Sequence, residues 1–210
     1  MIPLPIQREL LVEHGAYIFS GEINSNTAAM TVALLSRYAS ALSDRPHLLF
    51  YITSPGGGVE DALFLYDFLR FFDERVCPVI TVAAGYCLSG AVVVLQGGRT
   101  RLSFPHTTFF LHQIIMESSE EKLSEVLLST QFSIRLQNIM WRILEERSGG
   151  RITVKILKRR LKQGDWWLSA QDAVKYGLID DILKEGSDIA QYLSLLSECR
   201  QLLNEVDRTD

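Results

Sequence analysis

Three residue types that together can hydrolyse an acyl bond stand far apart in this sequence, as Ser89, His112 and Asp165. A serine hydroxyl becomes a nucleophile when a histidine takes its proton and a carboxylate orients the imidazole. Ser89 lies between Gly85 and Gly90, His112 ends the strand-like run TTFFLHQ, and Asp165 precedes two tryptophans. Ser89 and Asp165 also suit helix N-caps, and a lone histidine is often only hydrogen-bonded. The residues alone leave both interpretations open.

A glycine-rich turn, SPGGG at 54–58, separates an expected strand from an expected helix. Glycines let a backbone approach a ligand closely and leave amide N–H groups available to donate. The turn lacks the Lys and Ser/Thr of a phosphate-binding loop and is not GxGxxG, which disfavours nucleotide binding. A tight turn without a ligand is the alternative.

The hydrophobic pattern predicts alternating strands and helices, and therefore an α/β domain. Strands are expected at 16–22, 47–53, 76–84, 101–104, 107–112 and 178–183. Helices are expected at 26–42 with Asn26 as cap, at 59–72, from Ser89 onward, at 153–163 and after Ser169. A longer helix is expected between a capping box, Ser118 with Glu121, and a stop at Gly149-Gly150.

Composition and charge narrow the function. With 210 residues, 47% hydrophobic and 22% charged, the chain can build one ordinary core, which excludes a disordered or disulfide-stapled protein. A net charge of −4 disfavours a nucleic-acid binder. Six basic residues at 151–162 are expected to form a solvated helix face.

The expected compartment follows from the cysteines and the N-terminus. Cys77, Cys87 and Cys199 are odd in number and lack the spacing of a metal site or redox dithiol, which favours a reducing environment. Arg8 and Glu9 interrupt the N-terminus before any long apolar run. We therefore expect a cytoplasmic protein without an export signal.

One uncharged stretch, 76–98, is long enough to cross a bilayer, since about 20 apolar residues suffice. Its first half is β-branched, and its second half follows the glycine junction GYCLSG. That change favours a buried strand feeding a buried helix, so no membrane association is expected.

Four separated segments combine into a pattern: YITSPGGG, AAGYCLSGA, FFLHQ and GDWWLSAQDAVKYGLIDDIL. In order and approximate spacing they resemble the proteolytic-subunit family of the Clp protease, ClpP, over residues 16–185. The resemblance implies an α/β, crotonase-like (ClpP-type) fold of repeated β-β-α units with a long protruding helix. It implies a peptidase domain at 16–185, an N-terminal segment at 1–15 with a short axial loop, and a C-terminal helical tail at 186–210.

The resemblance also assigns roles. Ser89 would be the nucleophile, His112 the general base and Asp165 the orienting carboxylate, with the backbone N–H groups of Gly57 and Gly90 as the oxyanion hole. The chain would need no cofactor or metal, and ATP would enter only through a partner AAA+ unfoldase. Its substrates would be unfolded polypeptides or peptides, cleaved for protein quality control inside a homo-oligomeric ring, a heptamer or a tetradecamer.

The chain departs from the family pattern in three places. Cys87-Leu88 stand where small residues usually precede the serine, Trp166 replaces an arginine, and the glycine-rich strand usual after His112-Gln113 is missing. These differences leave one or two rings, and the need for an unfoldase, open.

Three other functions remain as alternatives. The departures are also consistent with a noncatalytic ClpP-like subunit of a mixed ring. Two more distant alternatives are acyl-CoA chemistry on the same scaffold and a signal-peptide peptidase with a Ser-Lys pair. The presence of Ser89, His112 and Asp165 together favours the serine peptidase.

Overall fold

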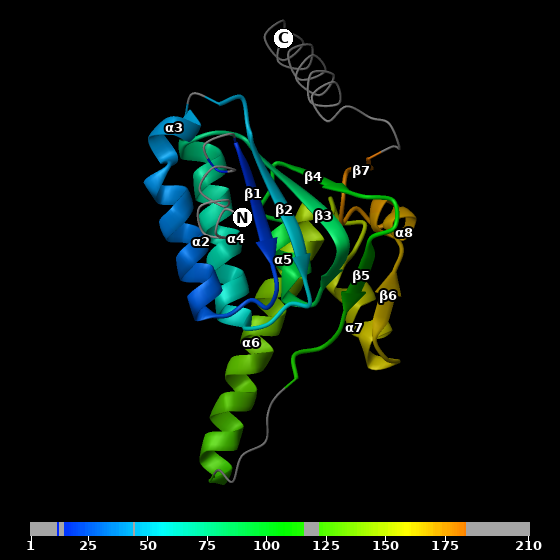
Figure 1. Ribbon diagram of the computed structural model, residues 1–210. Helices are drawn as coiled ribbons and strands as arrows, with labels where there is room; N and C mark the ends of the chain where they lie inside the picture. The colour runs from blue at the N-terminus through cyan, green and yellow to red at the C-terminus, as the bar shows by residue number, and fades with distance from the viewer. Residues whose placement is uncertain (1–11, 13–14, 44, 116–121, 184–210) are drawn as a thin grey trace, which may run out of the picture.

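One mixed, largely parallel sheet forms the centre of the molecule. The computed structural model describes residues 12, 15–43, 45–115 and 122–183. In this part of the chain, seven strands form a sheet in which β1-β2-β3-β4-β7 are neighbours, while β5 pairs with β3 and with β6 (Figure 1). The strands are β1 (Ala16–Ser20), β2 (Leu48–Ser54), β3 (Val79–Leu88), β4 (Thr100–Ser103), β5 (Thr108–Leu111), β6 (Trp166–Leu168) and β7 (Asp181–Ile182).

Helices connect these strands and cover the sheet. They are α2 (Ser25–Arg37), α3 (Ala39–Ser43), α4 (Val59–Arg75), α5 (Gly90–Leu95), α6 (Leu123–Arg147), α7 (Val154–Lys162) and α8 (Ala170–Lys175). In Figure 1, α2 and α4 lie together beside β1 and β2, and α6 extends away from the body of the molecule. The expected α/β fold, with a largely parallel sheet and a long protruding helix, is confirmed.

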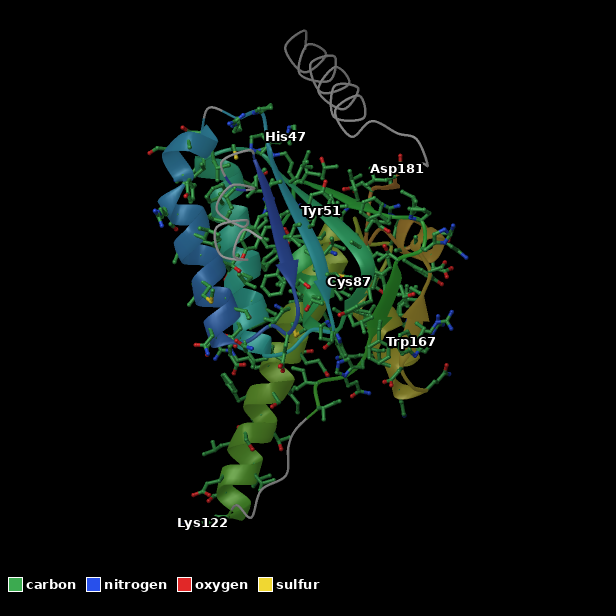
Figure 2. The ribbon with its side chains drawn as sticks, in the orientation of Figure 1. His47, Tyr51, Cys87, Lys122, Trp167 and Asp181 are labelled. Carbon is green, nitrogen blue, oxygen red and sulfur yellow. The ribbon has the colours of Figure 1, made fainter. Side chains whose placement is uncertain are left out.

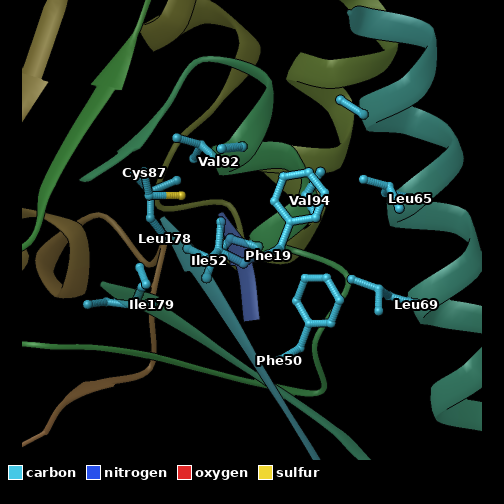
Figure 3. Packing of buried hydrophobic residues seen from close by; sticks show 14 of the residues in the cluster. Phe19, Phe50, Ile52, Leu65, Leu69, Cys87, Val92, Val94, Leu178 and Ile179 are labelled. Atoms are coloured by element: carbon cyan, nitrogen blue, oxygen red, sulfur yellow. The ribbon is translucent and has the colours of Figure 1, made fainter. Parts of the chain in front are cut away.

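The core lies between the sheet and α4 and α5. Phe50 of β2 is fully buried and stacks against Phe19 of β1, with ring centroids 6.3 Å apart. Figure 3 shows these rings facing Leu65 and Leu69 of α4, with Val94 of α5 close by. Burying each of these side chains contributes about 1.5–3 kcal/mol to folding. This packing fixes α5, and with it the residue that precedes α5, against the sheet.

Two expectations about the first helix are wrong. The expected helix at 26–42 is interrupted at Tyr38, giving α2 and α3. Its cap is Asn24, not Asn26, because Asn24 has the extended backbone of an N-cap and its Oδ1 accepts from the N–H groups of Asn26 and Thr27.

The uncharged stretch at 76–98 divides into a strand and a helix as predicted, β3 and the six-residue α5, but the strand ends at Leu88 and not at 84 as expected. Thr81 Oγ1 donates to Leu95 O at 2.7 Å and so ties the strand to the end of the helix. Within residues 12, 15–43, 45–115 and 122–183, no helix is both long enough and apolar enough to traverse a bilayer.

The end of the domain differs from expectation in its strands. The strand expected at 178–183 is shorter and consists only of β7, Asp181–Ile182. It begins late because Leu178 N–H donates back to Ala173 O and continues the turn after α8. The sequence did not predict β6, which pairs antiparallel with β5. The expected helix stop is confirmed, since Gly149 and Gly150 adopt φ of 62° and 76° just after α6.

A buried arginine joins the C-terminal ends of α5 and α6. Arg101 is 4% exposed and donates to Gln96 Oε1, to the carbonyls of Arg147 and Gly177, and to Asp180. Arg147 donates in turn to Gln96 O at 3.0 Å. In contrast, the six basic residues of the 151–162 stretch are all exposed, as expected of a solvated face.

Several expected features lie outside the described residues. The Ser118–Glu121 capping box and the tail at 186–210 are among them, as is the segment at 1–15 apart from Val12 and Gly15.

Candidate active site

Ser89 occupies a strained turn between β3 and α5. Its φ of 54° and ψ of −125° make it the one non-glycine residue with positive φ in the described part of the chain. Such a backbone costs on the order of 1–3 kcal/mol and is commonly found at functional sites. Ser89 stands at the N-cap of α5, yet its side chain makes no capping hydrogen bond. The hydroxyl therefore remains available to another partner.

That partner is His112. The Nε2 atom of His112 lies 2.6 Å from Ser89 Oγ, within reach for the hydroxyl to donate to a neutral imidazole. The pairing follows from the sheet, since β3 and β5 run parallel with Leu88 opposite Phe110. Serine and histidine thus each follow the last residue of two neighbouring strands, although 23 positions separate them in the chain.

An aromatic stack holds the imidazole. The ring of Phe110 stacks on that of His112 with centroids 5.2 Å apart, and Trp167 packs on Phe110 at 4.3 Å. Phe110 and Trp167 are paired residues on β5 and β6, and Trp167 is 60% exposed (Figure 2). The stack restricts rotation of the imidazole ring on one face.

Two side-chain amides hold the segment that follows His112. Gln113 Nε2 donates to Leu161 O in α7 at 2.8 Å. The backbone N–H of Ile114 donates to Gln137 Oε1 in α6 at 2.9 Å. The chain leaving the histidine is therefore anchored to both helices.

Asp165 immediately precedes β6, one position beyond the last paired residues of the β5–β6 ladder. In the antiparallel β5–β6 ladder, Phe110 pairs with Trp167 and Leu111 with Trp166, so the next pair in register is His112 with Asp165. Directly opposite residues of an antiparallel ladder share one face of the sheet. The Asp165 side chain is exposed, and among the described residues no hydrogen bond joins it to His112. The structure thus brings Ser89 and His112 into contact and leaves Asp165 adjacent.

Two backbone N–H groups beside Ser89 are unused within the described part of the chain. Ile23 N–H donates to Gly56 O and Gly58 N–H donates to Ile23 O, each at 2.8 Å, while neither Gly57 nor Gly90 donates. The glycine turn packs directly on the serine, since a Cβ on Gly56 would lie 2.7 Å from Ser89 Cβ. Unused donors next to a nucleophile are what an oxyanion hole requires.

A cavity of about 460 Å³ opens beside this group. The cavity is lined by the site residues Ser89, His112 and Gly57 and by Trp167. The rest of its wall is predominantly apolar: Leu88, Val93, Leu111, Ile114, Met140, Trp141, Leu144, Leu157 and Leu161. Its size is that of a small-ligand pocket, and its wall suits an apolar side chain. Glu22 is the one carboxylate in the lining that the described residues provide.

The residues that depart from the family pattern have structural roles here. Cys87 is fully buried, and burial strongly raises the pKa of its thiol, so it stays protonated and unreactive. Trp166 packs edge-on against Tyr176, with centroids 4.8 Å apart, and lies beneath the guanidinium of Arg160. No group of three or more His, Cys, Asp or Glu in the described ranges could hold a metal ion.

Sequence reasoning missed Gln137, Glu22 and Phe110. Gln137 belongs to no motif on its long helix, and only the fold brings it to Ile114. Glu22 could have been noted because it precedes the buried Ile23 by one residue, and extended chains alternate their faces.

The chain is similar to known proteins along most of its length. A family model described as Clp protease matches residues 6–186. The chain is 31% identical over 177 residues to the ATP-dependent Clp protease proteolytic subunit of Pleurastrum terricola, covering 83% of this chain and 86% of that one. It is 29% identical over 169 residues to the ATP-dependent Clp protease proteolytic subunit 3 of Synechococcus sp. (strain CC9605), covering 80% of this chain and 81% of that one.

Proposed function

This chain belongs to the Clp protease family, and we propose that it is a serine endopeptidase that hydrolyses peptide bonds of unfolded proteins or peptides. The observation that carries the proposal is the 2.6 Å contact between Ser89 Oγ and His112 Nε2, made by a serine in a strained turn. Nucleophilic catalysis requires a hydroxyl that contacts a histidine and is not engaged in another hydrogen bond, such as one that caps a helix.

The proposed reaction proceeds in two halves. His112 takes the proton of Ser89 as Oγ attacks the scissile carbonyl carbon, and the N–H groups of Gly57 and Gly90 donate to the resulting oxyanion. The C–N bond then breaks, and His112 gives its proton to the leaving amine. Water, deprotonated by His112, then attacks the acyl carbon. The ester bond to Ser89 breaks, His112 returns the proton to Oγ, and the product leaves as a carboxylic acid. Asp165 would orient the imidazole, a role that the family resemblance implies and that its position just before β6, one residue beyond the pairing with β5, supports.

The proposed substrate binds as an extended chain. The apolar cavity beside Ser89 fits one large apolar side chain next to the scissile bond. The chain uses no cofactor of its own in this mechanism, and ATP would be hydrolysed by a partner AAA+ unfoldase.

We propose that the chain works within a ring, a heptamer or two stacked heptamers, in the cytoplasm. The protruding α6 supports an assembly, because it carries exposed apolar side chains that a monomer would leave in water: Leu127, Leu128, Phe132 and Ile134. Cys77 and Cys87 are free thiols, as is usual in a reducing compartment.

A noncatalytic subunit of a mixed ring is the second candidate. The exposed position of Asp165, without a hydrogen bond to His112 among the described residues, favours it. A noncatalytic subunit, however, would not need the strained backbone of Ser89.

Intact mass after exposure to a fluorophosphonate probe separates the two candidates. We expect stoichiometric labelling of the wild-type chain and none of Ser89→Ala, with the oligomeric state of each sample recorded. An assembled wild-type ring that takes no label would reject the peptidase. Labelling of both proteins alike would mean that another residue is the nucleophile.

A further inference from the structure

Glu22 places a negative charge in an otherwise apolar catalytic cleft. It lines the cavity together with Pro55, Gly56 and Gly57, and the remaining lining is apolar apart from Ser89 and His112. No cation of the described residues forms an ion pair with it. With no cationic partner among the described residues, this carboxylate is available to a cation of the substrate, and the hydrolysis itself does not need it.

The backbone around Glu22 is fixed on both sides. Its own carbonyl accepts from Thr27 Oγ1 at 2.9 Å, and the next residue, Ile23, exchanges two 2.8 Å hydrogen bonds with the glycine turn. Ile23 is 1% exposed, so its side chain points into the core, and a Cβ on Gly90 would lie 3.8 Å from its Cδ1. Because neighbouring residues of an extended segment face opposite ways, Glu22 points away from the core and toward the cleft.

Glu22 is connected to the reacting serine through the glycine turn at 54–58. The backbone of Ile23 hydrogen-bonds to Gly56 and Gly58. Gly57, between these two glycines, provides one of the proposed oxyanion-hole N–H groups. Gly56 in turn packs on Ser89. Glu22 and Ser89 therefore line the same cavity, connected through the glycine turn that hydrogen-bonds to Ile23 and packs on Ser89.

We propose that Glu22 is a specificity-determining residue that favours substrates with a lysine or arginine close to the scissile bond. This inference rests on the proposed function, and it names a substrate class for the same cleft. A lysine or arginine suits the site because its aliphatic stem covers apolar surface while its cationic end reaches the carboxylate.

Peptide binding to full-length Ser89→Ala tests the inference without any need for catalysis. The peptides share one apolar residue before the scissile position and differ by a single Lys, Gln or Glu moved through the neighbouring positions. At one position we expect the Lys peptide to bind about two- to fivefold more tightly than the Gln peptide, the size typical of a partly exposed ion pair. The preference should weaken at high ionic strength.

Three further variants separate the effect of Glu22 from that of the overall negative charge. Glu22→Gln in the Ser89→Ala background should abolish the preference, and Glu22→Lys should reverse it toward Glu. Glu60→Gln removes an exposed acid of α4 that does not line the cavity, and should leave the preference intact. Absence of a Lys preference, its persistence in Glu22→Gln, or no binding of any peptide would overturn the inference.

The outcomes also distinguish this inference from the proposed hydrolysis. A charge preference in a protein that takes no fluorophosphonate would keep Glu22 as a recognition residue and reject the peptidase. Labelling of Ser89 with no charge preference would reject the role of Glu22 alone.

Discussion

The backbone N–H of Ser89 donates to the carbonyl oxygen of Phe110 at 2.8 Å, two residues before His112. This bond continues the pairing of β3 with β5 by one residue and joins the backbone of the nucleophile to the strand that presents the base. The distance between hydroxyl and imidazole is therefore set mainly by sheet geometry. Substitutions that shift the end of β3 or of β5 should therefore lower the reactivity of Ser89 even where the fold is kept.

Gly56→Ala should disable the site by displacing Ser89. The added Cβ would lie 2.7 Å from both Leu88 O and Ser89 Cβ, at a φ of +94° that alanine rarely adopts. Since a displacement of about 1 Å in a reacting group can cost on the order of 100-fold, fluorophosphonate labelling should slow by about that factor.

Gly21→Ala is the matched control for Gly56→Ala. Gly21 has a similar φ of +104°, but nothing lies within 4 Å of its Cβ position. Both variants should lose stability through backbone strain, and only Gly56→Ala should lose labelling. Equal loss of labelling in both would show that strain alone accounts for the effect.

Gln137→Leu should reduce reactivity because it removes the acceptor for the Ile114 N–H, two residues after His112. An unsatisfied, partly buried donor costs about 1–3 kcal/mol, and we expect roughly a tenfold slower labelling of Ser89. Gln137→Glu keeps an oxygen acceptor and should restore the rate. Gln131→Leu, at an exposed position of the same helix, should behave like wild type. Failure of Gln137→Glu to recover would assign the loss to packing.

Arg101→Met should destabilise the fold by about 3–5 kcal/mol, since it leaves Gln96 Oε1 and two backbone carbonyls without a donor, at about 1–3 kcal/mol each. Urea unfolding followed by circular dichroism measures this loss. Arg159→Met, at an exposed site of α7, should change stability by less than about 0.5 kcal/mol. Similar losses in the two variants would contradict the buried network.

Sequence could predict Ser89 at a junction between a strand and a helix, and His112 at the end of a strand, because each follows a run long enough to identify as a strand. The relation of Asp165 to His112 could not, since it depends on β6, whose three residues are too few to show a period.

The predicted end of β3, at 84, is wrong for a different reason, since the strand continues to Leu88. A glycine normally ends a predicted strand, but Gly85 adopts a φ of +70° inside β3. There the register shifts from Ile52–Ala83 to Ser54–Cys87, so β3 bulges and continues to Leu88. The extra residues place Ser89 opposite the chain after Phe110, a consequence that only strand pairing reveals.

The free energy of unfolding should fall as pH rises from about 9 to about 11, in part through Cys77. Burial, with a smaller contribution from the charge of Asp73, raises the pKa of this thiol from 9.0 to about 11. The unfolded chain loses the proton first, so stability is fully present below pH 9.0 and is lost up to the folded pKa, by at most about 3 kcal/mol. Cys77→Ala removes this contribution and keeps every other titrating group, so the difference between the two unfolding curves isolates it. Curves that stay parallel from pH 9 to 11 would contradict the burial of this thiol.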